Sequence, residues 1–203
     1  MLALDHIVVT AATLAEAVSH IEQALGVRLP EAIGRHDLMG THNRLLGLGP
    51  DDYLEAIAPD PAAPPPKERR WFDLDHVAGP ARLSNWVLRT DNLAACLGRL
   101  PGATGRQLDL SRGDFRWTMS APESGFQAYG GAFPALLQWH GGLKPPDRLA
   151  DAGCRLTGLE IAHPEAAEIA ALLGLRDARI QLVPGRPACR ARFATPHGER
   201  YLQ

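Results

Sequence analysis

The polar residues with the clearest chemical potential are His6 and Glu55, because each interrupts an apolar segment of the chain. His6 lies in LALDHIVVT and Glu55 in YLEAIAP, and both segments have the β-branched and apolar composition of a strand. Alternate residues of a strand share a face, so we expect His6 to lie on one face with Leu4 and Val8. A buried carboxylate needs a cation or several hydrogen-bond donors, and His6 is an available partner for Glu55. Together they could perform acid–base catalysis, with Glu55 as general base and His6 as proton carrier.

A second group of polar residues follows Gly40 in the segment GTHN. Glycine permits a tight turn, after which Thr41, His42 and Asn43 present three hydrogen-bonding side chains at the rim of a cavity. We predict that these three contact a ligand; an ordinary turn is the alternative, since Gly and Asn are common in turns. Arg116 is a candidate for binding an anionic group, with a solvated surface arginine as the alternative.

The elements around these residues predict a βαβββ order. A strand over residues 2–10 is followed by a T-x-x-E capping box at Thr13 and an apolar stripe that ends at Gly26, which indicates an amphipathic helix. Extended pieces then follow near 32–38, 43–48 and 53–58. The proline-rich segment PDPAAPPPKERR cannot pair within a central sheet and indicates a surface linker.

The same order of elements repeats after the linker. LDHIVVT and LSNWVLRTDNL open the two units alike, and YLEAI and ALLQW close them alike. A shorter third repeat begins at LTGLEIAHPEAAEIAALLGL, where a strand precedes a helix. The chain therefore divides into a first module, a linker, a second module and a partial third βαββ module packed on the same core, over residues 1–60, 61–82, 83–142 and 143–203.

The segments DHIVV, GTHN and YLEAIAPDP resemble the glyoxalase-like branch of the vicinal-oxygen-chelate superfamily, over nearly the whole chain. The resemblance implies an α+β fold in which paired βαβββ modules form a curved mixed sheet around one cavity. It also implies metal ligands on the first and last strands of each module. His6 and Glu55 match those positions, and Asn85 and Gln138 occupy them in the second module.

A divalent metal (Ni, Fe, Mn or Zn) is the cofactor that this resemblance implies, held by His6, Glu55 and Gln138. Asn85, His42 or His140 is the candidate fourth ligand. Such a metal would act as a Lewis acid on the vicinal oxygens of a substrate. Asn85 departs from the family pattern, because divalent transition metals prefer imidazole and carboxylate to neutral amides. A buried hydrogen-bonded pair of His6 and Glu55 is therefore the alternative.

Two functional hypotheses follow from the resemblance. The first is a metal-dependent lyase, isomerase or dioxygenase-like enzyme that acts on a small molecule. The second is a metal-free protein that sequesters its ligand, comparable to bleomycin-resistance proteins. The sequence contains no acidic residue at the matching strand positions of the second module, so it does not decide between them.

Composition narrows the class of partner. The 203 residues carry a formal charge of −2, and the basic residues are scattered, which argues against nucleic acid or an anionic membrane as partner and favours a small-molecule ligand. We expect no nucleotide cofactor and either a monomer or a homodimer. Three separated cysteines and the absence of a leader pattern at the N-terminus predict a cytoplasmic protein.

Overall fold

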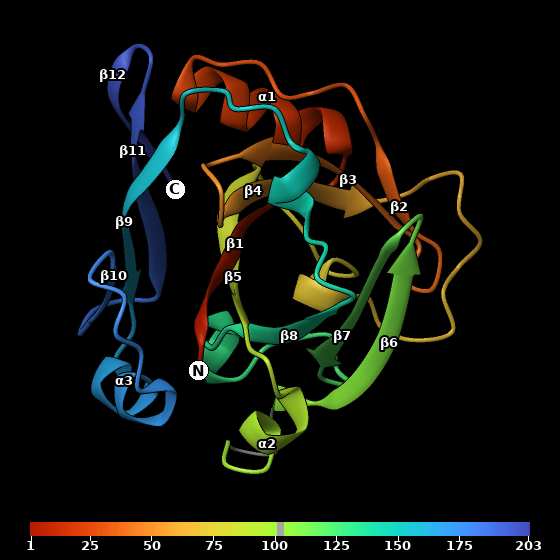
Figure 1. The fold of residues 1–203 in the computed structure, drawn as a ribbon, viewed down its shortest axis with the longest axis vertical. Coiled ribbons are helices and arrows are strands. Elements are labelled where there is room, and N and C mark those ends of the chain that lie inside the picture. The colour runs from red at the N-terminus through yellow and green to blue at the C-terminus, as the bar shows by residue number, and fades with distance from the viewer. Residues whose placement is uncertain (101–103) are drawn as a thin grey trace.

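The two predicted modules lie side by side in the computed structural model, which describes residues 1–100 and 104–203 (Figure 1). The first module consists of β1 (Ala3–Thr10), α1 (Leu14–Leu25), β2 (Gly34–His36), β3 (Thr41–Gly47) and β4 (Tyr53–Pro59). The second consists of β5 (Arg82–Arg89), α2 (Leu93–Leu97), β6 (Arg106–Arg112), β7 (Phe115–Ala121) and β8 (Ala135–His140). Both follow the predicted βαβββ order.

The strands of both modules form one sheet that curves around a central axis. Among the described residues its eight strands have the order β2-β3-β4-β1-β5-β8-β7-β6. In each module the first strand runs parallel to the last, and β1 and β5 join the two modules in an antiparallel pair. The edge strands β2 and β6 face each other across the remaining gap (Figure 1). The predicted curved mixed sheet is confirmed.

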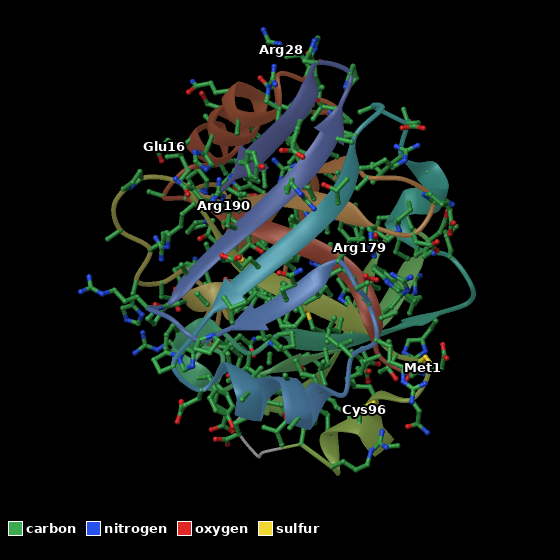
Figure 2. The ribbon with its side chains drawn as sticks, turned by 90° about the vertical axis from the view of Figure 1, so that its left-hand side faces the viewer. Met1, Glu16, Arg28, Cys96, Arg179 and Arg190 are labelled. Atoms are coloured by element: carbon green, nitrogen blue, oxygen red, sulfur yellow. The ribbon has the colours of Figure 1, made fainter. Side chains whose placement is uncertain are left out.

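The third unit has one strand more than we predicted and forms its own sheet. It consists of β9 (Arg155–Ala162), α3 (Ala166–Leu173), β10 (Ile180–Val183), β11 (Ala188–Thr195) and β12 (Gly198–Leu202). Its strands have the order β10-β9-β11-β12, so the first strand pairs with the second and third instead of the last. This small sheet, blue in Figure 2, packs through β11 against β5.

Helix α1 fills the space between the large sheet and β12. Its N-terminus has the predicted capping box, in which Thr13 and Glu16 exchange hydrogen bonds, and Gly26 ends it with φ +72°. The buried face of α1 consists of Leu14, Ala17, Val18, Ile21 and Leu25. Among the described residues, no helix is long and apolar enough to cross a membrane.

The linker contributes to the interior of the ring, which we did not predict. A 3-10 turn, η1 (Trp71–Asp73), lies inside the ring and is drawn in gold in Figure 1. Trp71 and Phe72 are buried there, next to side chains of β7 and β8. Phe72 and Asp73 have φ values of +57° and +54°, which non-glycine residues rarely adopt unless packing holds them. Two further turns are η3 (Tyr129–Gly131) and η4 (Pro145–Arg148).

Leu54 on β4 tests how much the hydrophobic cluster outside the ring contributes to the stability of the fold. Its side chain is fully buried against the elements that cover the sheet, so Leu54→Ala should lower the free energy of unfolding by about 2–5 kcal/mol. Leu38→Ala is the matched control, because Leu38 is 47% exposed. Urea unfolding measures both. Equal unfolding midpoints for the two variants would show that the core described here is wrong.

Candidate functional site

A β-bulge at Asp5 turns two consecutive residues of β1 towards the interior of the ring. The register of β1 on β5 shifts between Leu4 and His6, which leaves Asp5 without an opposite residue. Leu4 packs in the hydrophobic cluster outside the ring, whereas Val8 belongs to the hydrophobic cluster inside the ring. Our expectation that His6 shares its face with Leu4 is wrong, because the bulge interrupts the alternation between them; the shared face with Val8 is confirmed.

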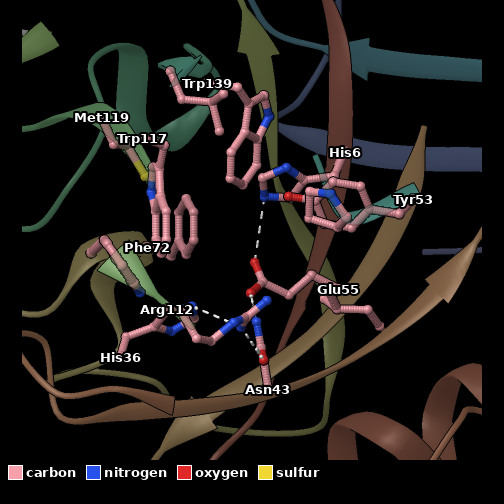
Figure 3. A pocket seen from close by; sticks show the side chains of 14 residues that line it. His6, His36, Asn43, Tyr53, Glu55, Phe72, Arg112, Trp117, Met119 and Trp139 are labelled. Atoms are coloured by element: carbon pink, nitrogen blue, oxygen red, sulfur yellow. Dashed lines mark hydrogen bonds and ion pairs between the residues drawn. The ribbon is translucent and has the colours of Figure 1, made fainter. Parts of the chain in front are cut away.

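His6 has a carboxylate partner at each ring nitrogen, and the one from Glu55 is drawn in Figure 3. Its Nδ1 lies 2.7 Å from Asp5 Oδ1, and its Nε2 lies 3.4 Å from Glu55 Oε2. The second oxygen of Asp5 accepts a hydrogen bond from Trp139 Nε1 at 2.8 Å. The imidazole stacks on Tyr53, with 4.4 Å between the ring centroids. Three contacts therefore fix the position of the His6 ring, and Trp139 fixes the Asp5 carboxylate in turn.

The ion pairs of His6 with Asp5 and Glu55 set the protonation states of the site. Burial disfavours the imidazolium form, but hydrogen bonds to Asp5 and Glu55, together with their charges, outweigh it and raise the pKa of His6 to about 9. Burial also disfavours ionisation of Glu55, yet its hydrogen bond to His6 and the His6 charge hold the pKa of this carboxyl below its ordinary value. At neutral pH the site therefore contains a buried imidazolium beside an ionised Glu55.

The second oxygen of Glu55 begins a hydrogen-bonded chain that reaches the opposite edge of the sheet. Asn43 on β3 donates its Nδ2 to Glu55 Oε1 at 2.5 Å. Its Oδ1 accepts from Arg112 Nη1 at 3.1 Å. Arg112 is the last residue of β6, so its side chain spans the gap between the two edge strands. The same Nη1 lies 3.5 Å from His36 Nε2 on β2.

Because Gly34 has no side chain, the Arg112 guanidinium has room to lie beside Asn43. A Cβ atom on Gly34 of β2 would lie 2.1 Å from Arg112 Nη1 and 2.2 Å from Asn43 Oδ1, so any larger residue would displace these two groups. Burial lowers the pKa of His36 to about 4, with the charge of Arg112 acting in the same direction and that of Glu55 against it. His36 is therefore neutral and adds no charge beside the guanidinium.

Aromatic side chains surround the polar chain. Besides the groups described above, the cavity is lined by Trp71, Phe72, Trp117, Met119, Leu137 and Trp139, which are drawn in Figure 3. The cavity volume is about 30 Å³. Since a water molecule occupies roughly 10–15 Å³ on this measure, a larger ligand requires side chains to move. Small-molecule sites commonly combine such apolar walls with a few polar groups.

The structure does not bring Gln138 to His6 and Glu55. Its Oε1 accepts a hydrogen bond from the backbone N of Leu93 at 2.9 Å, at the start of α2, whereas Leu137 faces the cavity. Gln138 therefore lies outside the cavity, and β8 contributes the apolar side chain of Leu137 to the cavity wall instead.

Asn85 is also outside this cavity. It lies opposite Val8 on the neighbouring strand and lines a separate pocket between β5 and the small sheet, together with Ser84 and Glu160. The second module therefore supplies neither of the two ligands that the resemblance implied. Its contribution to the cavity wall is mainly apolar.

Of the three GTHN side chains, two lie at the site. Asn43 bridges Glu55 and Arg112, as described above. Thr41 Oγ1 lies 3.0 Å from His36 Nδ1, which orients this imidazole towards the guanidinium. His42 points to the outer side, where its Nδ1 lies 3.8 Å from Asp60 Oδ1.

Arg116 lies near the cavity but outside it. Its Nη1 donates to the backbone oxygens of Gly113 and Phe115 at the exposed end of the β6–β7 hairpin. Arg112, four residues earlier on the same hairpin, faces the cavity instead. His140, a candidate fourth ligand, lies 2.9 Å from Thr118 Oγ1 and does not line the cavity.

Sequence reasoning missed five residues of the site: Asp5, His36, Trp71, Phe72 and Arg112. The signal for Asp5 is present, since a second polar residue directly beside His6 breaks strand alternation and is typical of a bulge. The other four come from a short edge strand, a linker and a strand end. Their positions depend on how the ring closes, which no local pattern describes.

The fold and the site can now be compared with known proteins. A family model described as a glyoxalase-like domain matches residues 4–175. The chain belongs to this glyoxalase-like family. No curated protein is significantly similar in sequence. The family assignment therefore stands on a match over most of the chain, and it confirms the resemblance to the vicinal-oxygen-chelate superfamily.

Comparison with a solved structure shows the same fold at low identity. A hypothetical protein from Staphylococcus aureus has 12% identity and a TM-score of 0.54, over 99% of this chain and 84% of that chain. Methylmalonyl-CoA epimerases from Streptomyces coelicolor and Mycobacterium tuberculosis have 15% and 22% identity and TM-scores of 0.46 and 0.42. They cover 70% and 67% of this chain, and 98% and 85% of their own chains are matched.

The metal site implied by the glyoxalase-like resemblance does not fit these side chains. Among the described residues, no group of three or more His, Cys, Asp or Glu is arranged to hold a metal ion. His6 is paired with a carboxyl group at each ring nitrogen, β8 gives the cavity the apolar side chain of Leu137, and the Arg112 guanidinium also lines the cavity. Two donors flanked by a cation are a poor divalent-metal site.

The charge of His6 predicts a specific pH dependence of stability. Because the folded pKa of about 9 exceeds the ordinary value of 6.5, the stabilisation is complete below pH 6.5 and is lost as the pH rises through 9. At about 1.4 kcal/mol per pKa unit, the loss is roughly 3 kcal/mol. Urea unfolding at several pH values measures it, with His6→Gln as comparison.

Histidine NMR resonances provide the direct control for this prediction. In the folded protein, His6 should titrate near pH 9 and His36 near pH 4, with each resonance assigned by its absence in His6→Gln or His36→Gln. A His6 resonance that titrates near its ordinary pKa would show that the ion pairs described above are not formed.

Proposed function

We propose that this protein binds a small, flat carbonyl compound at the His6–Glu55 pair and moves a proton on the carbon beside the carbonyl, without a metal. The observation that carries the proposal is the imidazolium of His6, held between two carboxyl groups at the wall of an aromatic cavity. Buried groups whose pKa values are shifted in opposite directions are typical of acid–base sites. The reaction class is that of an isomerase or a lyase.

Each residue has one role in this proposal. Glu55 accepts the proton from carbon, because its carboxylate is ionised and faces the cavity. His6 Nε2 donates its proton to the carbonyl oxygen, so the product is a neutral enol and the Glu55 carboxyl has gained the proton that carbon lost. Asp5 stabilises the imidazolium through Nδ1 and fixes the ring orientation. Asn43 orients Glu55 through the hydrogen bond to Oε1.

The aromatic walls favour a flat ligand. Three of the four tryptophans line the cavity, namely Trp71, Trp117 and Trp139, and their faces are suited to stacking on a planar group. The rest of the wall consists largely of paired strands, whereas Trp71 and Phe72 belong to the linker turn. A ligand larger than two water molecules therefore enters by displacing this turn.

Ligand sequestration without chemistry is the second candidate function. The observation in its favour is that the polar groups from Asp5 to Asn43 already satisfy one another by hydrogen bonds and ion pairs. A site of this kind holds its ligand by wall contacts and leaves the internal chain intact. This candidate predicts binding that does not depend on the ability of Glu55 to accept a proton.

Acetophenone separates the two candidates, because it is flat and carries exchangeable protons beside its carbonyl. We expect binding by calorimetry in the presence of a chelator, and catalysed exchange of its methyl protons in D2O, followed by NMR. Glu55→Gln keeps the shape and removes the base, so it should reduce exchange about 100-fold or more, which is the usual scale of general-base catalysis.

His20→Gln is the matched control, since His20 lies on the outer helix and bonds to the backbone oxygen of Gln203. Binding without exchange in the wild-type protein would favour sequestration. The absence of both binding and exchange would contradict the proposed function, and exchange that Glu55→Gln retains would remove Glu55 from its role.

A further inference from the structure

The guanidinium of Arg112 has no anionic partner. Among the described residues no carboxylate lies within 4.0 Å of it, and its Nη1 reaches only Asn43 and a neutral His36. No acceptor within the described parts of the chain bonds to its Nε or Nη2. Its one further contact is the ring of Phe115, at 5.9 Å from the centroid. A half-buried cation with free donors favours an anion.

A second donor at the same cavity is also unused. Trp71 lines the cavity and is 3% exposed, yet its indole Nε1 is buried and has no hydrogen-bond partner among the described residues. An unsatisfied buried donor costs free energy, and an acceptor supplied by a ligand would recover it. Trp139 differs, since its Nε1 bonds to Asp5.

We propose that Arg112 and the indole N–H of Trp71 form a carboxylate-binding subsite, so that the ligand of this cavity is a small oxo acid. The inference rests on the proposed function and narrows its substrate class. The carboxylate lies on the β6 side of the cavity, beside the guanidinium. The carbonyl carbon next to it then faces His6 and Glu55.

The surroundings of Arg112 support a binding role over a purely structural one. A structural arginine at a sheet edge normally bonds to a carboxylate or to backbone oxygens, as Arg116 does with Gly113. Arg112 instead points inward, through the space that Gly34 leaves open. Arg112 and Arg116 lie on the same hairpin, so Arg116 is a control for the binding role of Arg112.

The test compares 2-oxo-2-phenylacetate with its neutral isostere 2-oxo-2-phenylacetamide by calorimetry on the full chain. The wild-type protein should bind the acid about 10- to 100-fold more tightly than the amide, which corresponds to one charge-assisted hydrogen-bonded contact. Arg112→Gln should remove this preference and still bind the amide. Arg116→Gln should retain the preference, because that side chain lies outside the cavity.

Two further variants address the same subsite while keeping the Arg112 charge and an aromatic ring at position 71. Gly34→Val displaces the guanidinium and should lower the affinity for the acid as Arg112→Gln does. Trp71→Phe keeps a phenyl ring but removes the pyrrole part of the indole with its N–H, and it should weaken binding of the acid several-fold more than binding of the amide. Circular dichroism and the unfolding midpoint verify that each variant is folded.

The outcomes separate the subsite from the proposed function. Equal binding of acid and amide by the wild-type protein overturns the carboxylate subsite and leaves the proposed function in place. A preference that survives Arg112→Gln but not Arg116→Gln also overturns it. If neither compound binds, and acetophenone does not bind either, the proposed function fails and the subsite fails with it.

Discussion

The constraint on which the rest of the site depends is the charge of His6. A buried imidazolium is stable only if carboxylates replace the water it has lost. Asp5 and Glu55 provide them from two different strands, and each is in turn fixed by a further donor, Trp139 for Asp5 and Asn43 for Glu55. The bulge in β1 lies at Asp5, and it brings the Asp5 carboxylate onto the same side of the strand as the His6 ring.

The two modules share their topology but divide the work of the site. The first provides the polar groups, on β1, β3 and β4, whereas β7, β8 and the linker provide most of the aromatic and apolar walls. A row of polar groups opposite an apolar wall favours a ligand that has one polar side and one apolar side. Arg112 is the exception, because the second module extends this one cation across the gap to the first. Its contacts with His36 and Asn43 also connect the two edges of the sheet.

The sequence predicted the elements well because each has a local cause. Alternation, the capping box at Thr13 and the repeated opening and closing segments indicate the two βαβββ modules, and the structure has the strands of the first module within a few residues of the expected bounds. His6 and Glu55 followed from polar residues in apolar strands and Asn43 from the GTHN segment, and the structure brings all three together.

The remaining errors have physical reasons that a local pattern does not contain. A bulge shifts the alternation by one residue, which concealed the role of Asp5. In β8, Gln138 bonds to the backbone at the start of α2, so the strand gives the cavity the apolar side chain of Leu137 and not the predicted ligand. Arg112, His36 and Trp71 meet only when the curved sheet and the linker bring distant segments together, since they belong to β6, β2 and η1.

The most direct test of the central claim is the metal content of the protein, because the claim is that the partner of Glu55 is a proton on His6. Elemental analysis by plasma mass spectrometry, after dialysis against Ni, Fe, Mn and Zn in turn, measures it for the wild-type protein and for His6→Ala. We expect amounts far below one metal ion per chain and no difference between the two proteins. Near-stoichiometric metal that is lost in His6→Ala would contradict the claim.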